Sequence, residues 1–383
     1  MSMSRRHFLG ATAAASAGVL ALSRGAHAAG SDVLKVGLVG CGGRGTGAAA
    51  NAINADPGVK IVAVADAFAD RAENALKALT KRYPDRVDVP ASRCFIGFDG
   101  YKQLLAEDID VVLLASPPHF RPKHLAAAIE ANKHVFAEKP VGVDATGVRS
   151  VLATCDVARK KNLCIVSGLC WRYDTVIRET IKRLHDGAIG DILSVQSTRN
   201  LGYLWHRERQ PDWTEMEFQM RNWYYFTWLS GDHNVEQQIH GIDKCSWALG
   251  DKPPVKAWAV SGRQVRTDPE YGNIYDHHSV VYEYENGVKF YALARQQPNC
   301  YNAYTETLLG TKGRCDLQKG EIVGETNWKH GEQAGDMSCY AGRGKGKLRP
   351  MHQVEQDELF AAIRAGKVIN NGEYMCQSTL LAI

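Results

Sequence analysis

The sequence lacks the marks of several protein classes. It has ten cysteines but no CxxC pair, which argues against a zinc knuckle and a thioredoxin-type redox centre. It has no block or stripe of basic residues, so nothing suggests a nucleic-acid partner. Beyond the first 22 residues, no apolar run is long enough to cross a bilayer. Several cysteines lie in apolar segments, where free buried thiols are expected, and we predict no disulfide framework.

The first 28 residues have the three parts of an export signal. Ser4-Arg5-Arg6-His7-Phe8-Leu9 is followed by an apolar run to Leu22 and by Ala26-His27-Ala28. The paired arginines indicate the twin-arginine route, which carries folded proteins. We therefore expect interaction with the twin-arginine export machinery, cleavage after Ala28 and a periplasmic protein. An uncleaved, membrane-retained signal is the alternative. Removal of residues 1–28 would leave 43 basic against 42 acidic residues.

The length that follows the signal predicts two domains. From residue 34 to 141, short apolar runs alternate with helix-length amphipathic stretches, which is typical of an α/β fold with a parallel sheet. We assign residues 32–155 to a dinucleotide-binding domain and 156–383 to a substrate-binding and oligomerisation domain. The predicted strands of the first domain are 34–39, 60–65, 110–115 and 134–137, and the predicted helices are 45–54, 69–82 and 122–131.

A glycine-rich turn follows the first predicted strand. In Gly40-x-Gly42-x-x-Gly45 the first glycine permits a tight turn, the second lets a pyrophosphate approach and the third lets the helix pack closely. Asp66 ends the second strand, where its carboxylate can bind the ribose hydroxyls and repel a 2′-phosphate. The pattern predicts NAD as cofactor, with NADP less favoured. The predicted cofactor-binding residues here are Gly40, Gly42, Gly43, Arg44, Gly45 and Asp66.

Polar residues follow the next two strands. The third strand ends in Ser116-Pro117-Pro118-His119, with His124 one helical turn later, and the fourth ends in Glu138-Lys139-Pro140. Ligands of open parallel sheets bind at the carboxyl ends of strands. We therefore expect Ser116, Pro117, His119, His124, Glu138 and Lys139 on the nicotinamide side of the cofactor.

Together these motifs resemble the Gfo/Idh/MocA family, and the resemblance covers nearly the whole chain after the signal. It implies a Rossmann domain followed by an α/β domain with an open, mostly antiparallel sheet. The runs 192–199, 255–261, 278–284 and 288–294 fit strands of that sheet. The resemblance also implies a returning C-terminal helix, at about 351–365, and a homo-oligomer (a dimer or tetramer).

The resemblance further implies catalysis by Lys139 with a carboxylate–His pair on a helix of the second domain. The matching stretch is Glu236-Gln237-Gln238-Ile239-His240, followed by Asp243; it has Glu where the family more often has Asp. The implied reaction is NAD(H)-dependent oxidation of a secondary alcohol of a sugar, glycoside or polyol, with a tightly bound cofactor. His240 is the expected base and Lys139 the group that contacts the reacting oxygen.

An aromatic-rich segment, residues 201–229, could line the substrate pocket. Stacking of carbohydrate on aromatic rings and packing in a core or subunit interface explain it equally well. The candidate substrate contacts are Lys139, Tyr173, Arg221, Asn222, Trp223, His240 and Asp243. Trp171 and Arg172 are further candidates for contacting the cofactor.

Three alternatives compete with the dehydrogenase. His233, Glu236, His240 and Asp243 form a ligand-like run, but its spacing is not that of an established metalloprotease, and we predict no metal. An NAD-dependent glycosidase would oxidise C3 transiently and eliminate the aglycone. A non-catalytic sugar-binding protein could retain the Rossmann scaffold without the reaction.

Overall fold

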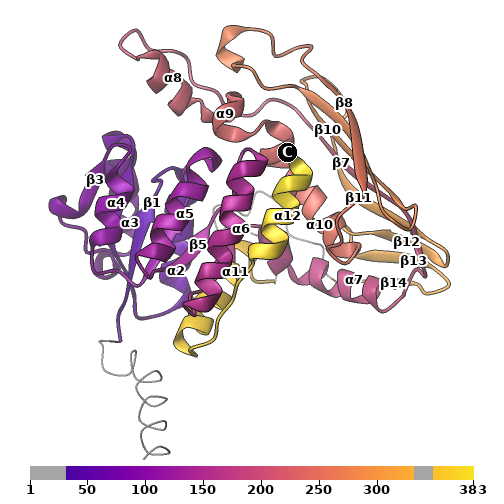
Figure 1. Ribbon diagram of the computed structural model, residues 1–383, viewed down its shortest axis with the longest axis horizontal. Coiled ribbons are helices and arrows are strands. Elements are labelled where there is room, and N and C mark those ends of the chain that lie inside the picture. Colours follow the sequence, from indigo (N-terminus) through magenta and orange to yellow (C-terminus); the bar gives the residue numbers. More distant parts are fainter. Residues whose placement is uncertain (1–31, 332–347) are drawn as a thin grey trace, which may run out of the picture.

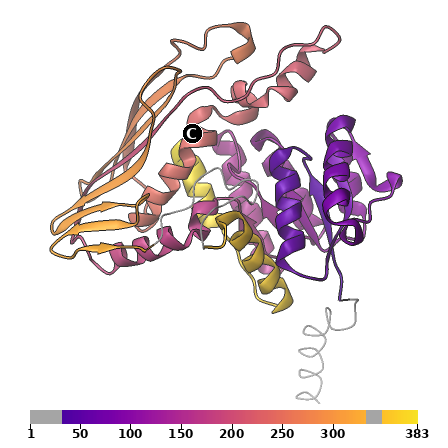
Figure 2. The same ribbon diagram turned by 180° about the vertical axis from the view of Figure 1, so that it is seen from behind.

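The computed structural model describes residues 32–331 and 348–383. The expected export signal, residues 1–28, lies outside this part of the chain. Within it the polypeptide forms two sheets, each with its own helices (Figures 1 and 2). None of the helices in the described part has the length and apolar content needed to cross a bilayer.

The first sheet has six strands and is parallel, as the alternating pattern predicts. Four of the six are the predicted strands. Its spatial order is β3 (Cys94–Ile96), β2 (Val59–Asp66), β1 (Leu34–Val39), β4 (Val111–Leu114), β5 (His134–Ala137) and β6 (Ile165–Ser167). This is the doubly wound dinucleotide-binding topology, in which the strand order reverses between β1 and β4. Proteins with this topology bind ligands at the carboxyl ends of the two strands where the order reverses. The helices that follow the strands are α2 (Gly43–Ala55), α3 (Ala69–Arg82), α4 (Gly100–Ala106), α5 (Arg121–Glu130) and α6 (Ala145–Lys160).

The second sheet has eight strands and is antiparallel except where β10 pairs with β7. Its order is β14 (Trp328–Lys329), β13 (Glu321–Gly324), β12 (Gly313–Asp316), β11 (Ala303–Gly310), β7 (Ile192–Leu201), β10 (Lys289–Gln296), β9 (His277–Glu283) and β8 (Lys256–Gly262). Helices α7 (Thr175–His185) and α10 (Ile239–Ala248) lie on one side of it, and no helix of the described residues covers its other side (Figures 1 and 2). The predicted fold class, a Rossmann sheet plus an open antiparallel sheet, is confirmed.

The sequence patterns did not predict β11 to β14. In β11 an inward position is occupied by Glu306, which is fully buried and lies 2.6 Å from the ammonium of Lys244 on α10. A charged residue at a core position breaks the apolar alternation by which a strand is recognised. The ion pair compensates the charge in the folded protein, but the sequence alone does not reveal the partner.

The two last helices return to the first domain. Helix α11 (Met351–Arg364) packs on α2, and α12 (Gly372–Ala382) lies between α6 and α10 (Figure 1). Arg364 donates to both carboxylate oxygens of Asp56, and Asn370 forms a β-bridge with Ile165. The end of the described chain therefore completes the first domain.

The nine cysteines in the described part of the chain are free thiols, and seven of them are buried. Burial raises the pKa of Cys155 to about 12. Buried thiols of this kind act as small apolar side chains.

Candidate active site

The turn after β1 has the geometry that the glycine motif predicts. Gly40 has φ +93°, and a Cβ there would lie 2.5 Å from the backbone of Ala115 and Ser116. A Cβ on Gly45 would lie 1.9 Å from the carbonyl oxygen of Gly40, so helix and turn touch. In contrast, a Cβ on Gly42 would meet no atom within 4 Å. Gly40 and Gly45 are therefore required by packing, whereas Gly42 faces open space at the start of α2.

Asp66 joins the ends of β1 and β2. Its carboxylate accepts hydrogen bonds from the backbone N–H of Cys41 (2.7 Å) and Phe68 (3.0 Å). Burial raises the pKa of Asp66, although these two hydrogen bonds oppose the shift. The carboxylate is thus held beside the glycine turn, where the sequence predicts that it binds the ribose hydroxyls.

A cavity of about 410 Å³ lies over this turn. Its volume is within the range of small-molecule sites. Eleven of the predicted site residues line it: Gly40, Gly42, Gly43, Arg44, Gly45, Asp66, Ser116, Pro117, His124, Arg221 and Trp223. Most of the predicted cofactor-binding residues therefore line this cavity.

A segment of the second domain covers this cavity. Residues 202–231, with α8 (Glu215–Arg221) and α9 (Thr227–Ser230), reach from the second sheet over the first domain (Figures 1 and 2). Arg221 donates to both carboxylate oxygens of Asp70 on α3, at 3.0 and 3.2 Å, and its guanidinium lies 4.1 Å from the centre of the Phe68 ring. We call residues 202–231 the strap. Two of its predicted substrate residues, Arg221 and Trp223, thus lie at the cofactor cavity.

Of the two histidines that follow β4, one lines the cavity and the other lies on the surface. His124 is buried against Tyr101, and its Nδ1 lies 3.1 Å from Ser116 Oγ. Burial lowers the pKa of His124 to about 3, so its imidazole is neutral at neutral pH. His119 is exposed, packs edge-on against Trp228 of the strap and does not line the cavity.

Lys139 and Glu236 form a buried ion pair between the two domains. Lys139 Nζ lies 2.6 Å from Glu236 Oε2 and 2.7 Å from the Glu236 carbonyl oxygen. Residues Asn234–Gln238 are a π-helix, and not the α-helix assumed from the spacing of Glu236 and His240. Such insertions are frequent at functional sites. Here the backbone as well as the side chain of Glu236 accepts from the lysine.

His240 follows directly on α10 and is almost completely buried. Neither of its ring nitrogens has a hydrogen-bond partner. Burial and, after it, the positive charge of Lys139 hold the pKa of His240 well below its usual range. The imidazole is therefore neutral and has both nitrogens available, which suits a group that exchanges a proton with a ligand.

Arg44 connects the segment that carries Lys139 to the glycine turn. Its Nε lies 2.6 Å from Glu138 Oε1, and its Nη2 lies 3.8 Å from Glu355 Oε1 on α11. Arg44 also lines the cavity, while Glu138 directly precedes Lys139. The cofactor cavity and the Lys139–Glu236 pair are thus neighbours.

Other predicted site residues are engaged elsewhere. Arg172 forms a buried bidentate pair with Asp243, whose oxygens lie 2.8–3.1 Å from the guanidinium nitrogens, and also binds Asp251. Tyr173 donates to Asn371 at 3.0 Å, and Asn222 is buried against the backbone of Arg207. Trp171 is fully buried. None of these residues lines the cavity, and their contacts join the second domain to itself or to α12.

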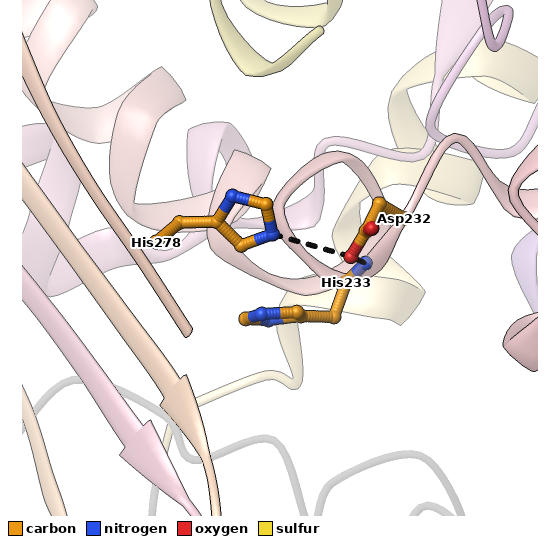
Figure 3. Close-up of side chains that lie close together, drawn as sticks. All are labelled: Asp232, His233 and His278. Carbon is orange, nitrogen blue, oxygen red and sulfur yellow. Dashed lines mark hydrogen bonds and ion pairs between the residues drawn. The ribbon is translucent and has the colours of Figure 1, made fainter. Parts of the chain in front are cut away.

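The four residues of the ligand-like run, His233, Glu236, His240 and Asp243, do not form a common metal site. Glu236 binds Lys139, and Asp243 binds Arg172. The ring nitrogens of His240 have no hydrogen-bond partner. His233 lies instead beside Asp232 and His278 (Figure 3).

Some lining residues were not predicted from the sequence. The cavity also contacts Phe68, Arg71, Phe98, Trp205, Arg207 and Met220. Trp205 and Met220 fall in the aromatic-rich segment, which was a usable signal, whereas Phe68 and Phe98 look like ordinary loop residues. Arg121 was also missed: its buried guanidinium donates to the carbonyl oxygens of Leu114 (2.6 Å) and Pro140 (3.4 Å) and so fixes the turn around Lys139.

Comparison with known proteins agrees with this geometry. Residues 34–167 match the family model described as Gfo/Idh/MocA, an oxidoreductase family with an NAD-binding Rossmann fold. Over residues 34–167 the first domain is therefore similar to this family. The match covers the whole first sheet, including the glycine turn, Asp66 and the Glu138-Lys139-Pro140 segment.

Proteins similar to this chain have names that denote different activities. The chain is 28% identical over 256 residues to inositol 2-dehydrogenase 3 of Saccharopolyspora erythraea, covering 67% of this chain and 64% of that protein. It is 30% identical over 178 residues to glycosyl hydrolase family 109 protein 1 of Bacteroides fragilis, covering 45% of this chain and 36% of that protein. The matches thus span less than two thirds of these curated relatives. Levoglucosan dehydrogenase, solved with NADH and levoglucosan, shares the fold with a TM-score of 0.67 at 18% identity, over 91% of this chain and 95% of that one.

Proposed function

We propose that this protein is an NAD(H)-dependent oxidoreductase that acts on a secondary alcohol of a sugar, glycoside or polyol. The observation that carries the proposal is the Lys139–Glu236 pair, which adjoins the glycine-turn cavity through Glu138 and Arg44. Inositol 2-dehydrogenase 3 and levoglucosan dehydrogenase are relatives that act on such alcohols, which supports the substrate class.

The residues around the cavity fit NAD. Gly42 leaves open space at the start of α2, where free backbone N–H groups can bind a pyrophosphate. Asp66 offers a carboxylate to ribose hydroxyls and would repel the extra phosphate of NADP. When bound, the nicotinamide supplies the hydride acceptor or donor.

The protein side chains supply proton transfer. In this proposal Lys139 donates a hydrogen bond to the reacting oxygen and stabilises negative charge that develops there. Neutral His240 accepts the hydroxyl proton. Glu236 positions Lys139, since both its carboxylate and its carbonyl hold the ammonium group.

The strap supports tight cofactor binding. It covers the cavity from the second domain and is anchored to Asp70 and Phe68 by Arg221. We expect these contacts to slow the release of a ligand that lies beneath the strap. We infer that the cofactor is retained between turnovers.

Mass spectrometry of nucleotide released by denaturing the purified protein tests this function first. Near-stoichiometric NAD(H) supports a retained cofactor, and NADH formation with a panel of polyols and sugars then identifies the substrate class. A protein that carries no nucleotide and binds neither NAD nor NADP would overturn the proposal and favour the non-catalytic scaffold.

A redox-neutral glycosidase is the second candidate, favoured by the similarity to glycosyl hydrolase family 109 protein 1. It would release an aglycone from a glycoside without net NADH formation. Measuring aglycone release and NADH absorbance in the same reaction distinguishes the two activities.

We also propose export by the twin-arginine route and a periplasmic location, supported by the sequence of residues 4–28. Replacing Arg5 and Arg6 together by lysine should retain the protein in the cytoplasm. N-terminal sequencing of the periplasmic wild-type protein should begin at Ala29, the residue after Ala28.

A homo-oligomer is proposed from the side of the second sheet that no described helix covers. Large apolar side chains are exposed on its strands, namely Leu193, Trp258, Val260, Tyr291, Leu309 and Val323. An extended exposed apolar surface favours association. Light scattering after size exclusion should give a dimer or tetramer, and Val260→Glu should shift it toward the monomer.

A further inference from the structure

Three side chains with metal-binding groups meet outside the proposed active site. Asp232 and His233 precede the π-helical turn, and His278 lies on β9. One candidate ligand atom from each residue lies within 4.8 Å of the other two (Figure 3). His278 Nε2 and Asp232 Oδ1 are 3.2 Å apart. Two imidazoles and one carboxylate thus converge on one point.

His233 is the unusual member of this group. Only 1% of its surface is exposed, and its Nε2 has no hydrogen-bond partner. Its ring centre lies 4.5 Å from that of His278. Leaving a buried polar atom unpaired is unfavourable, so this nitrogen is a candidate ligand atom.

The other two ligands are held by neighbouring groups. His278 Nδ1 lies 2.9 Å from Ser261 Oγ on β8. When Nδ1 donates to that hydroxyl, Nε2 is the unprotonated nitrogen and faces Asp232. Asp232 accepts from the backbone N–H of Tyr275 through Oδ2 (2.9 Å) and from that of His233 through Oδ1 (2.5 Å). Such outer contacts orient metal ligands in known sites.

The group is accessible to an ion. Asp232, His278, Ser261 and Tyr275 line a second cavity, between β8, β9 and the end of α12. Arg266 and Asp276 also act electrostatically on His233, and their effects on it are opposite in sign. The carboxylate of Asp232 therefore gives the site its net negative charge.

We propose that Asp232, His233 and His278 bind a divalent transition-metal ion of the Zn²⁺ class, with a further coordination position open toward the cavity. Imidazole and carboxylate together select Zn²⁺ and its neighbours over Ca²⁺ and Mg²⁺. Tetrahedral ligands about 2.0 Å from zinc are roughly 3.3 Å apart, which the Asp232–His278 distance matches. The ligand atom of His233 lies within 4.8 Å of the other two, so it has to approach them by up to about 1.5 Å for every pair to reach that spacing.

The ion would act apart from hydride transfer. Its ligands join β9 to the turn that carries Glu236, whose N–H donates to the carbonyl oxygen of Asp232. Occupancy should therefore stiffen the backbone that positions Lys139, and metal binding should raise the melting temperature by mass action.

The experiment uses the full purified chain, stripped with EDTA and dialysed, and titrates it with Co²⁺ and then Zn²⁺. We expect one ion per chain, visible absorption of tetrahedral Co²⁺, and displacement of Co²⁺ by Zn²⁺. His233→Gln and His278→Gln should weaken affinity ~100-fold or more, because each removes one of three ligands. His277→Gln is the matched control, because His277 adjoins His278 but binds Asp276. The metal affinity of this variant should equal that of the wild type.

Two results would overturn the proposal. One is a wild-type chain that takes up neither ion; the other is equal uptake by all three variants, which would place the ion elsewhere. Ser261→Ala guards against variants that fail to fold, since it leaves all ligands in place and should weaken binding about 10–100-fold. Unchanged affinity in this variant, with Gln variants that do not fold, also contradicts the proposed coordination.

Discussion

Lys139 Nζ lies 2.6 Å from the carboxylate of Glu236, and this ion pair crosses from the end of β5 to the π-helical turn of the second domain. Both side chains are buried. Burial raises the pKa of Glu236, and the lysine ammonium partly offsets that shift. The two domains are therefore joined at the residues to which we assign the chemistry.

Removing one partner of this pair should destabilise the protein more than removing both. Lys139→Met leaves Glu236 buried without a counter-charge, which costs about 3–5 kcal/mol, whereas Lys139→Met with Glu236→Leu should recover a large part of that loss. Urea unfolding at neutral pH measures the difference. Lys182→Met, which breaks the exposed pair with Asp186, should leave the stability almost unchanged. Losses that simply add in the double variant would show that the residues are not coupled.

Two glycines of the same turn should respond differently to alanine. Gly45→Ala forces a Cβ to within 1.9 Å of the Gly40 carbonyl oxygen, so the variant should be strongly destabilised or fail to fold. Gly42→Ala meets no protein atom and should melt like the wild type, while its methyl group blocks the pyrophosphate and lowers NAD affinity. Melting curves and NAD titrations of both variants test this contrast. Normal NAD affinity in Gly42→Ala would place the cofactor elsewhere.

Asp66 should set the affinity for NAD and the discrimination against NADP. Asp66→Asn removes the charge and should weaken NAD binding about 10–100-fold, since hydrogen bonds to charged groups contribute about 1.5–3 kcal/mol. The ratio of NADP to NAD affinity should rise at the same time. Asp108→Asn, on an exposed carboxylate paired with Lys35, should change neither value. Calorimetric titration with both nucleotides gives the two constants.

Acid should destabilise the protein through His124. Its folded pKa is about 3 and its unfolded pKa is about 6.5, so only the unfolded chain takes up a proton between these values. The stabilisation is complete above pH 6.5 and is lost as the pH falls toward 3. His124→Gln should reduce the stability difference between pH 7.5 and 5.5 by about 1.4 kcal/mol. Denaturant unfolding at the two pH values measures this, and an unchanged difference would contradict the assigned shift.

The strap should control cofactor release. Arg221→Ala removes the contacts to Asp70 and Phe68, so NAD(H) should dissociate faster, with the purified protein carrying less nucleotide. Arg209→Ala, whose guanidinium pairs with Glu215 on the same segment, keeps the anchor and should retain the wild-type rate. Stopped-flow dilution of the nucleotide-loaded protein gives both rates. Equal rates in all three proteins would mean that the strap does not limit release.

Local patterns in the sequence predicted the local parts of the site. The glycine turn, Asp66 and the strand ends at Ser116 and Lys139 each lie within one βα unit, where periodicity and spacing carry the information. The pairing of Arg44 with Glu138 and Glu355 joins three segments far apart in the chain, and no local pattern encodes it.

Two further features were not predictable for specific physical reasons. The π-helix at Asn234–Gln238 adds a residue to a helical turn without any signature in the spacing of Glu236 and His240. The strap was recognised as aromatic-rich, but the sequence did not show which surface it covers. The position of the strap over the first domain depends on the contact between Arg221 and Asp70, which are far apart in the sequence.

The return of α11 and α12 to the first domain has a consequence for synthesis on the ribosome. Ile165 bridges to Asn370, and Ser167 N–H donates to Asn371, about 200 residues later. At 5–20 residues per second the ribosome needs roughly 10–40 s to make that stretch. Throughout that interval the edge of the first sheet at β6 and the face of α2 lack their covering. A nascent chain of this protein is thus exposed to aggregation longest at its first-made domain, and a chaperone that binds there would act until the last helix emerges.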